Sequence, residues 1–338
     1  MPATQVTVAV PTLTADSHLR RVVEALLSQT LPDSDIAVID NSGRQLARRR
    51  LEGIADPRLR FLENARNLGF GAAVNQAWRS SDSPYVAAIN DDALPSPRWL
   101  AELVSAMETH PRAGMCASRV ILPDGALDSA GMRIGGDGSS RQRGHLETPR
   151  AFDEPAEVLL PSGSAALYRR AMLDELGGFD DDFFLYCEDT DLGLRGRWLG
   201  WECRYVPSAV VEHHYSATAG RVSPLKAYYI ERNRMFVALK NFPLRLLWRA
   251  PFITMTRYAW HALAAVKGRG AAGQYRNAGH GSLSLVTTVA RAHAACLGSA
   301  VTLWRKRREV RRAARIPASE FTRLLRRHWI SAREVAEL

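Results

Sequence analysis

The feature that most constrains the fold is an alternation of two periods over the first 120 residues. Short apolar, β-branched runs alternate with segments whose apolar residues recur at i, i+3 and i+4, the spacing of an amphipathic helix. Strands and helices of these lengths in alternation predict parallel βαβ units, with helices on both faces of the sheet. The expected strands cover 6–13, 35–40, 59–64 and 85–90, and the expected helices cover 17–29, 44–54, 71–80 and 97–110.

After residue 120 the pattern changes twice. Residues 121–150 are rich in Gly, Asp and Ser and predict loops or a short hairpin. Beyond residue 224 the chain becomes helical and basic. We therefore predict an α/β domain over residues 1–222 and a helical region over residues 223–338. Between them, residues 157–170 and 202–216 are expected to be extended and residues 188–200 helical.

The net charge of +10 is unevenly distributed between these regions. Residues 226–338 hold 22 Lys and Arg against 5 Asp and Glu, whereas the preceding residues hold 23 against 30. A basic helical region fits a solvated helix face, a nucleic-acid backbone or an anionic membrane surface. Composition alone leaves these three readings open.

Cysteine spacing and hydropathy indicate the kind of cellular compartment in which the chain would fold. The four cysteines are scattered with no CxxC spacing, so the sequence predicts neither a zinc site nor a disulfide framework and fits a reducing compartment. The first 13 residues lack the basic start of a signal peptide. The longest uncharged stretches near the C-terminus, such as 277–290, are shorter than the ~20 residues that cross a bilayer. We expect no transmembrane segment.

Two adjacent carboxylates, Asp91 and Asp92, directly follow the apolar run of residues 85–90, and no Lys or Arg occurs before Arg98. An Asx turn would explain them without any ligand. The alternative is a hard divalent cation, Mg²⁺ or Mn²⁺, that shares the phosphates of a nucleotide. Ligands of parallel sheets collect at the carboxyl ends of strands, where Asp40 also falls.

A second acidic cluster occupies residues 180–191. Acidic residues at a helix start interact well with the helix dipole, which explains most of them without chemistry. Asp191 has Arg195 four residues later and predicts an ordinary helix ion pair. Asp189 has Gly193 in that position and no local partner, so it is the better candidate for a general base.

Two further segments carry weaker signals. A histidine is more often a satisfied polar residue than a ligand, but the pair in residues 210–214 would complete a reasonable Mn²⁺ site beside two carboxylates. The glycines and asparagines of residues 65–78 suit a turn near a phosphate, although such turns are common.

Together these segments form an ordered series of short motifs. They are PTLT (11–14), VIDNSG (38–43), NLGFGAAVN (67–75), NDDA (90–93), GSAALYRR (163–170), GGFDDDFFLYCEDTDLGLR (177–195), GW (200–201) and VVEHH (210–214). In this order they resemble the family 2 glycosyltransferases, which are inverting, nucleotide-sugar-dependent enzymes of the GT-A fold. Residues 227–241, AYYIERNRMFVALKN, are similar to the bacterial rhamnosyltransferase and galactofuranosyltransferase branch. The resemblance covers residues 5–242 and implies a mostly parallel sheet flanked by helices, followed by a basic helical extension.

The resemblance implies a role for each matching residue. Asp92 matches the metal-binding Asp that ends the DxD motif, and His213 matches a third metal ligand, with His214 as the alternative. Asp189 matches the catalytic base. Asn90 stands where many members have the first Asp, which weakens the expected metal dependence. The implied donor contacts are Thr12, Asp40, Asn67, Gly69, Asn75 and Asp91, and the implied substrate contacts are Glu188, Gly163 and Trp198.

The implied activity is transfer of a sugar, with dTDP-rhamnose as the first choice of donor, to a hydroxyl of a glycan or lipid-linked glycan in cell-envelope polysaccharide synthesis. The cofactor would be Mg²⁺ or Mn²⁺. The alternatives are a UDP-sugar transferase, for example of galactofuranose, and a non-catalytic basic module that binds anionic lipid or nucleic acid. A lipid-linked acceptor favours an anionic membrane surface as the partner of residues 301–329, and no nucleic acid. We then expect a cytoplasmic protein, peripheral on the inner face of the plasma membrane, whose oligomeric state stays open.

Overall fold

The computed structural model describes residues 4–215, 223–268 and 270–337. The chain divides into two compact units. The expected boundary at residues 222–223 touches the segment 216–222, which lies outside the described residues. The first unit comprises residues 1–132, 142–196 and 201–218, and the second comprises residues 133–141, 197–200 and 219–338.

A mixed sheet forms the centre of the first unit, and its described part has ten strands. Two short strands pair at one side of it: β5 (Ala93–Pro95) with β12, and β7 (Leu127–Ser129) with β6. The remaining strands are, in order across the sheet, β10 (Ala156–Val158), β12 (Glu202–His213), β6 (Ala113–Ile121), β11 (Ala165–Arg169), β4 (Tyr85–Ile89), β1 (Val6–Thr12), β2 (Ser34–Asp40) and β3 (Leu59–Glu63).

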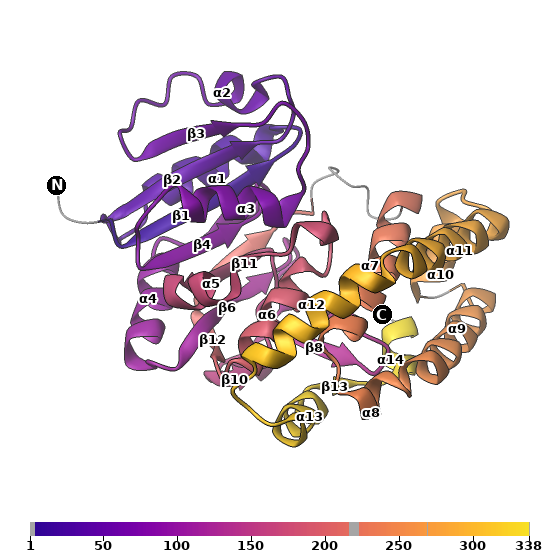
Figure 1. Ribbon diagram of the computed structural model, residues 1–338. Coiled ribbons are helices and arrows are strands. Elements are labelled where there is room, and N and C mark those ends of the chain that lie inside the picture. Colours follow the sequence, from indigo (N-terminus) through magenta and orange to yellow (C-terminus); the bar gives the residue numbers. More distant parts are fainter. Residues whose placement is uncertain (1–3, 216–222, 269, 338) are drawn as a thin grey trace. The chain divides into compact units, whose positions relative to one another are not determined.

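The first four expected strands are β1 to β4, and they lie side by side in parallel, as predicted (Figure 1). β12 and β6 are also parallel, whereas β11 runs antiparallel to both β4 and β6. Side chains alternate across β1, so that Val8 and Val10 pack into one apolar cluster and Ala9 into the other. Both faces of the sheet are therefore buried, which explains why these strands are continuously apolar.

Helices of the first unit cover these faces. The expected helix over 44–54 is shorter than predicted, because the chain turns at Gly53, which has a φ of 87°. The helices are α1 (Ser17–Leu27), α2 (Leu46–Arg50), α3 (Phe70–Arg79), α4 (Trp99–Thr109), α5 (Arg170–Leu176) and α6 (Glu188–Trp198), with 3₁₀ turns η1 (Pro149–Phe152) and η2 (Asp181–Phe183).

The segment expected to form loops or a hairpin contains three short strands. One of them, β8 (Met132–Gly135), pairs with β9 (Ser140–Gln142) and, in parallel, with β13 (Trp329–Ile330), forming a second small sheet. Ile134 pairs with Trp329 in this sheet. The sequence did not predict this pairing because its partners are far apart along the chain.

The second unit is mainly helical, as predicted. None of its described helices, nor any other described helix, is long and apolar enough to span a membrane. The helices, orange to yellow in Figure 1, are α7 (Pro224–Asn241), α8 (Leu244–Leu247), α9 (Ala250–Val266), α10 (Gly270–Asn277), α11 (Ser282–Gly298), α12 (Ala300–Ala313), α13 (Ala318–Arg327) and α14 (Ala332–Glu337).

A buried ion-pair cluster joins α7 to α9 inside this unit. Glu231 of α7 pairs with Arg234 and lies 2.8 Å from Nη2 of Arg257. Asp137 accepts a hydrogen bond of 2.7 Å from Nε of Arg257. Burial alone would raise the pKa of Glu231, but Arg257 and Arg234 outweigh it and hold that pKa well below its usual range. The motif that resembles the rhamnosyltransferase branch thus contributes internal charge pairs.

Candidate active site

The carboxyl end of β4 and the end of β12 bring Asp92 and His213 together. The antiparallel pairing of β5 with β12 sets Ala93 opposite His213, and the backbone N–H of His214 donates to the carbonyl oxygen of Asp92. As a result, Nε2 of His213 lies 3.2 Å from Oδ1 of Asp92. Both side chains are buried.

A third residue fixes the other side of the His213 ring. Nδ1 of His213 lies 3.0 Å from Oδ2 of Asp128, and the other carboxylate oxygen, Oδ1, accepts a 2.6 Å hydrogen bond from the hydroxyl of Tyr215. Burial would lower the pKa of His213, but Asp128 and Asp92 raise it to about 9. Sequence reasoning missed Asp128 and Tyr215. Asp128 is one of several Asp residues in a Gly-rich and Ser-rich segment, and no local signal distinguishes it.

The side chain of the neighbouring histidine, His214, contacts Glu212 and His18. Nε2 of His214 lies 2.8 Å from Oε1 of Glu212, and its ring centroid is 5.0 Å from that of His18. Of the two histidines that the sequence left open, His213 is the one whose side chain lies against the Asp92 carboxylate.

Asp91 is held by the end of the adjacent strand β1. The hydroxyl of Thr12 donates a 2.5 Å hydrogen bond to Oδ2 of Asp91 and accepts one from the backbone N–H of Ala15. Burial raises the pKa of Asp91 to about 7; the hydrogen bond from Thr12 opposes this effect, and the charge of Asp92 adds to it. The Thr12 hydroxyl is thus engaged with the acidic motif.

Asn90 occupies the position where a first Asp was expected. Its amide nitrogen Nδ2 lies 3.4 Å from Nε2 of His213, and its backbone N–H donates to the carbonyl oxygen of Ser164. An amide at this position adds no third negative charge to Asp91 and Asp92.

Two of the residues expected to contact the donor, Asp40 and Asn67, lie at the end of β2 and in the loop before α3. Asp40 lies opposite Thr12 in the parallel register, and its two oxygens accept 2.8 Å bonds from the backbone N–H groups of Ser42 and Ala47. Asn67 accepts a 2.9 Å hydrogen bond from the backbone N–H of Gly69.

Gly69 is required by the backbone at this point. It has a φ of 89°, and a Cβ there would lie 2.1 Å from the carbonyl oxygen of Phe184. A side chain at this position is therefore strained and also blocked.

Two of the expected contacts serve packing. Asn75 is buried; its amide donates to the carbonyl oxygen of Phe179 and accepts from the backbone N–H of the same residue, so it fixes the loop before α6. The substrate contact implied for Trp198 is not supported by its surroundings. Its side chain is 1% exposed, its indole N–H donates to the carbonyl oxygen of Asn241, and its ring stacks on Phe321. A side chain enclosed in this way does not reach a substrate.

Asp189 lies in the first turn of α6 and is partly exposed. Its carboxylate accepts hydrogen bonds from the backbone N–H groups of Gly163, at 2.8 Å, and Thr190, at 2.6 Å. This corrects the expectation that it lacks a local partner, although no Lys or Arg forms a salt bridge with it in the described part of the chain. Burial raises the pKa of Asp189 despite these hydrogen bonds.

The pKa of the preceding residue, Glu188, is raised as well. Burial, together with the charge of Asp189, raises the pKa of Glu188 to about 8, which favours its protonated form at neutral pH. The loop leading to this pair is strained, because Phe184, Tyr186 and Cys187 all have φ between 62° and 67°. Non-glycine residues in the left-handed region cluster at functional sites.

The expected ion pair in α6 is confirmed. Nε of Arg195 donates a 2.8 Å bond to Oδ2 of Asp191, and both side chains are buried. Arg195 also donates to the carbonyl oxygens of Leu176 and Gly178. The pair therefore also anchors α6 to the turn before it, beyond the ordinary helix ion pair that the spacing predicted.

The donor atoms around Asp92 suit a divalent cation. Asp92 offers a carboxylate oxygen, and His213 would offer Nε2 once an arriving cation displaces its proton. Asp128 orients that imidazole as carboxylates do for metal-bound histidines. The described residues contain no group of three His, Cys, Asp or Glu arranged to hold an ion by themselves. Mg²⁺ and Mn²⁺ sites often use only one or two side chains and are completed by substrate phosphates and water. The site fits an ion held jointly with a nucleotide.

Comparison with known proteins decides the family. The sequence profile described as "Glycosyl transferase family 2" matches residues 7–177, about half of the chain. The chain belongs to glycosyl transferase family 2. The predicted resemblance is therefore confirmed, and two relatives support the rhamnosyltransferase-like branch within this glycosyltransferase family.

The first of these relatives is the N-acetylglucosaminyl-diphospho-decaprenol L-rhamnosyltransferase of Mycobacterium tuberculosis. It is 31% identical over 268 residues, which cover 69% of this chain and 83% of that protein. The second is the O-antigen biosynthesis protein RfbC of Myxococcus xanthus. It is 30% identical over 224 residues, covering 63% of this chain and 18% of that protein.

Solved structures show that the fold is of the GT-A type, as expected. GalNAc-T7 with UDP, GalNAc and Mn²⁺ superposes with a TM-score of 0.60 at 15% identity, over 79% of this chain and 51% of that chain. A second solved structure is the mannosyltransferase PcManGT from Pyrobaculum calidifontis in complex with GDP-Man and Mn²⁺. It superposes with a TM-score of 0.55 at 19% identity, over 92% of this chain and 86% of that chain. At these identities the likeness concerns the fold alone.

Proposed function

We propose that this glycosyltransferase is inverting and metal-dependent, and that it transfers a sugar from a nucleotide-sugar donor to a hydroxyl of a lipid-linked glycan. One observation carries the proposal. Asp92 and His213 meet at the carboxyl ends of strands, where parallel sheets bind their ligands, and Asp128 orients His213 from behind.

The site residues divide into two groups by role. Asp92 and His213 would hold Mg²⁺ or Mn²⁺, and such an ion stabilises the negative charge that develops on a departing nucleoside diphosphate. Thr12 and Asp40 lie at the strand ends where the base and ribose would bind, and Asn67 lies in the turn that would line the donor pocket. Asp91 would lie near the diphosphate or donor sugar. Gly69 gives the loop its backbone conformation.

On the acceptor side, Asp189 accepts the proton of the attacking hydroxyl. Gly163 and Thr190 hold its carboxylate in place through backbone N–H groups. Glu188, whose raised pKa favours the protonated form, can donate a hydrogen bond to the acceptor. Attack from the face opposite the departing diphosphate inverts the anomeric configuration.

The name of the mycobacterial relative supports a rhamnosyl donor and a sugar carried on a diphospho-polyprenol as acceptor. dTDP-rhamnose is accordingly the first donor to test, followed by UDP-sugars such as UDP-galactofuranose. A non-catalytic basic module is the weaker reading, because Asp92, Asp189 and His213 are all present. We further propose that the enzyme works at the inner face of the plasma membrane, since a polyprenol-linked acceptor resides there and the second unit is strongly basic.

A thermal-shift screen tests the donor site. The purified chain is heated with dTDP-rhamnose, UDP-galactofuranose, UDP-glucose and GDP-mannose, each with and without Mn²⁺. We expect one nucleotide to raise the melting temperature, and only when Mn²⁺ is present, because Asp92 and the diphosphate would hold the ion jointly.

Asp92→Ala should abolish that shift, whereas the control Asp82→Ala, a carboxylate in the turn before β4, should keep it. Stabilisation of wild type that is unchanged by removal of Mn²⁺, or that survives in Asp92→Ala, would remove Asp92 from the donor site.

A further inference from the structure

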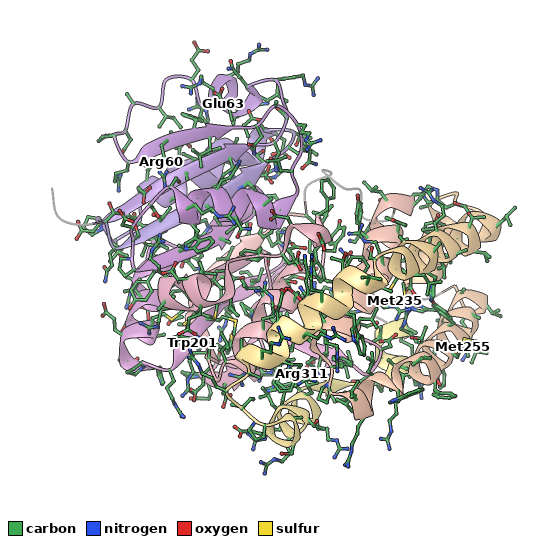
Figure 2. All side chains as sticks on the ribbon, viewed as in Figure 1. Arg60, Glu63, Trp201, Met235, Met255 and Arg311 are labelled. Carbon is green, nitrogen blue, oxygen red and sulfur yellow. The ribbon has the colours of Figure 1, made fainter. Side chains whose placement is uncertain are left out.

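The second unit exposes a row of large apolar side chains. Trp248 at the end of α8 and Phe252, Met255, Leu263 and Val266 of α9 are each between 52% and 82% exposed. Along α9 these positions are three, eight and three residues apart, which places them on one side of the helix. Figure 2 marks Met255 within this row, which we call the apolar α9 face.

Charge is absent from the exposed side of α9. Its one charged residue, Arg257, is buried in the ion-pair cluster with Glu231. The other exposed positions of this helix include Thr256, Ala259 and Ala262, which are small or neutral. Contiguous exposed apolar surface of this kind marks a site of interaction.

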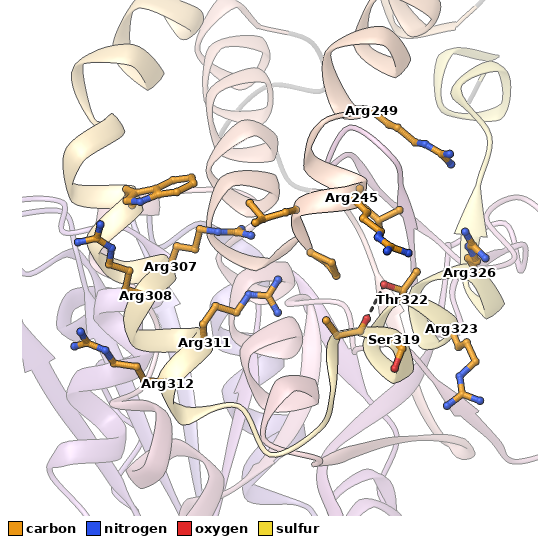
Figure 3. Close-up of a pocket in the computed structure, with 15 residues that line it drawn as sticks. Arg245, Arg249, Arg307, Arg308, Arg311, Arg312, Ser319, Thr322, Arg323 and Arg326 are labelled. Carbon is orange, nitrogen blue, oxygen red and sulfur yellow. Dashed lines mark hydrogen bonds between the residues drawn. The ribbon is translucent and has the colours of Figure 1, made fainter.

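A groove rich in arginine begins on the same segment of chain. It has a volume of about 1240 Å³, and no acidic residue is among the described residues that line it. Figure 3 shows Arg307 and Arg311 of α12 reaching into the space from one side, with Arg245 on another. We call this the arginine groove; its other arginines include Arg249 and Arg323.

No acidic side chain in the described part of the chain neutralises the positive charge of the groove. Among the described residues no Asp or Glu forms a salt bridge with these arginines; Arg307 donates to the carbonyl oxygen of Leu239, and Arg311 lies 3.8 Å above the ring of Trp198. Burial, and then the charge of Arg307, lowers the pKa of Arg311 to about 10. Clustered guanidinium groups repel one another, and oxyanions such as phosphate match their hydrogen-bonding geometry.

The two features share one short segment and so call for one partner. Leu244 and Trp248 alternate with Arg245 and Arg249 at the junction of α8 and α9. A second copy of the chain would bring two strongly basic regions together, and a nucleic acid would leave the apolar α9 face in water. An anionic bilayer accepts apolar side chains at its interface and attracts arginine to its phosphates.

We propose that the apolar α9 face and the arginine groove together form a docking surface for an anionic phospholipid bilayer. The apolar side chains enter the interfacial layer, and the groove holds lipid phosphate groups. The proposal rests on the proposed function, which requires access to a lipid-linked acceptor. It places the docking surface on α8 and α9 as well as α12, in contrast to the basic segment 301–329 expected from the sequence.

Co-sedimentation with vesicles tests this surface. The full chain is mixed with vesicles of phosphatidylcholine, or of phosphatidylcholine and phosphatidylglycerol, at low and high salt. We expect binding to the mixed vesicles that weakens with salt. Arg245→Gln and Arg249→Gln should each lower the affinity about fivefold, the usual contribution of one arginine near an anionic surface. Phe252→Ser with Met255→Ser should weaken binding at both salt concentrations.

Two matched controls test whether vesicle binding depends on this surface or on any exposed arginine or apolar side chain. Arg305→Gln removes an exposed arginine of α12 outside the groove, and Leu146→Ser removes an exposed leucine of the first unit. Both should bind nearly as wild type does. Equal binding of wild type to neutral and mixed vesicles, or equal losses in the controls and the surface variants, would overturn the proposal.

Two further measurements keep the proposal distinct from its alternatives. If Phe252→Ser with Met255→Ser dissociates a dimer in sedimentation velocity and leaves vesicle binding intact, the occupant is a second copy and the proposal is wrong. The donor-dependent thermal shift is recorded for the same variants and should be unchanged. If no donor shifts the melting temperature of wild type, that result counts against the proposed function, and the vesicle-binding result is unaffected by it.

Discussion

His213 lies between two carboxylates that are far apart in the sequence. Its Nε2 faces Asp92 and its Nδ1 faces Asp128, 85 residues earlier along the chain. A carboxylate behind a ligating histidine fixes the orientation of the ring and increases its basicity. Asp128 is thus a positioning residue, and its effect on the donor site would pass through His213.

We predict that Asp128→Asn weakens Mn²⁺-dependent binding of a nucleoside diphosphate about 10- to 100-fold, because the amide keeps the shape of the side chain and removes its charge. Calorimetric titration of Mn²⁺ in the presence of the nucleotide measures this directly. The control is Asp124→Asn, an exposed carboxylate in the neighbouring turn. If Asp128→Asn binds Mn²⁺ as tightly as wild type, His213 does not depend on Asp128.

Residue roles were predictable where the determining partner is local. Arg195 stands four residues after Asp191, so their ion pair could be predicted from the spacing alone. Asn75 shows the opposite case, because its amide bonds to Phe179, 104 residues away. Nothing in its own segment indicates whether such an Asn faces a ligand or holds a loop.

At the scale of elements, the parallel strands β1 to β4 were predictable because each is a buried apolar run between turns. The pairing of β8 with β13 was not, since it joins Ile134 to Trp329 through a strand of only two residues. Short strands carry no period, and their pairing is fixed by tertiary packing. The shortened α2 is a further case, decided by a turn at Gly53.

The ion-pair cluster between α7 and α9 gives the second unit an acid-sensitive element. The folded pKa of Glu231 lies below its ordinary value of 4.5, so its stabilising contribution is present above that pH and is lost as the pH falls through the folded pKa. Thermal unfolding from neutral pH to about pH 3 should show a steep loss of stability for wild type.

Glu231→Gln should lower the free energy of unfolding by about 3–5 kcal/mol, because it leaves Arg234 and Arg257 buried with one carboxylate fewer. Its stability should also depend less on acid than that of wild type. Parallel curves for the two proteins over this pH range would show that Glu231 is not the group that titrates.

At the scale of the whole molecule, composition predicted a basic region but not which of its side chains are exposed. Exposure depends on packing, so Arg234 and Arg257 are buried in charge pairs while Trp248 and Phe252 face outward. The basic charge was therefore predictable from the sequence, and the apolar α9 face was not.

The central claim is that the first unit carries out inverting sugar transfer with Asp189 as the base. The Asn replacement keeps the shape of this side chain and its place beside Gly163 but removes the proton acceptor. Turnover should fall about 10²- to 10⁴-fold, the usual contribution of a general base, while donor affinity stays near that of wild type.

The most direct measurement is transfer from dTDP-rhamnose, or from the donor that the thermal screen selects, to a sugar on a diphospho-polyprenol, with the product linkage read by NMR. We predict that wild type yields a product of inverted anomeric configuration, and that Asp189→Asn binds the donor normally but forms product at least about 100-fold more slowly. A product that retains the donor configuration, or an Asp189→Asn variant that turns over as wild type does, would contradict the account.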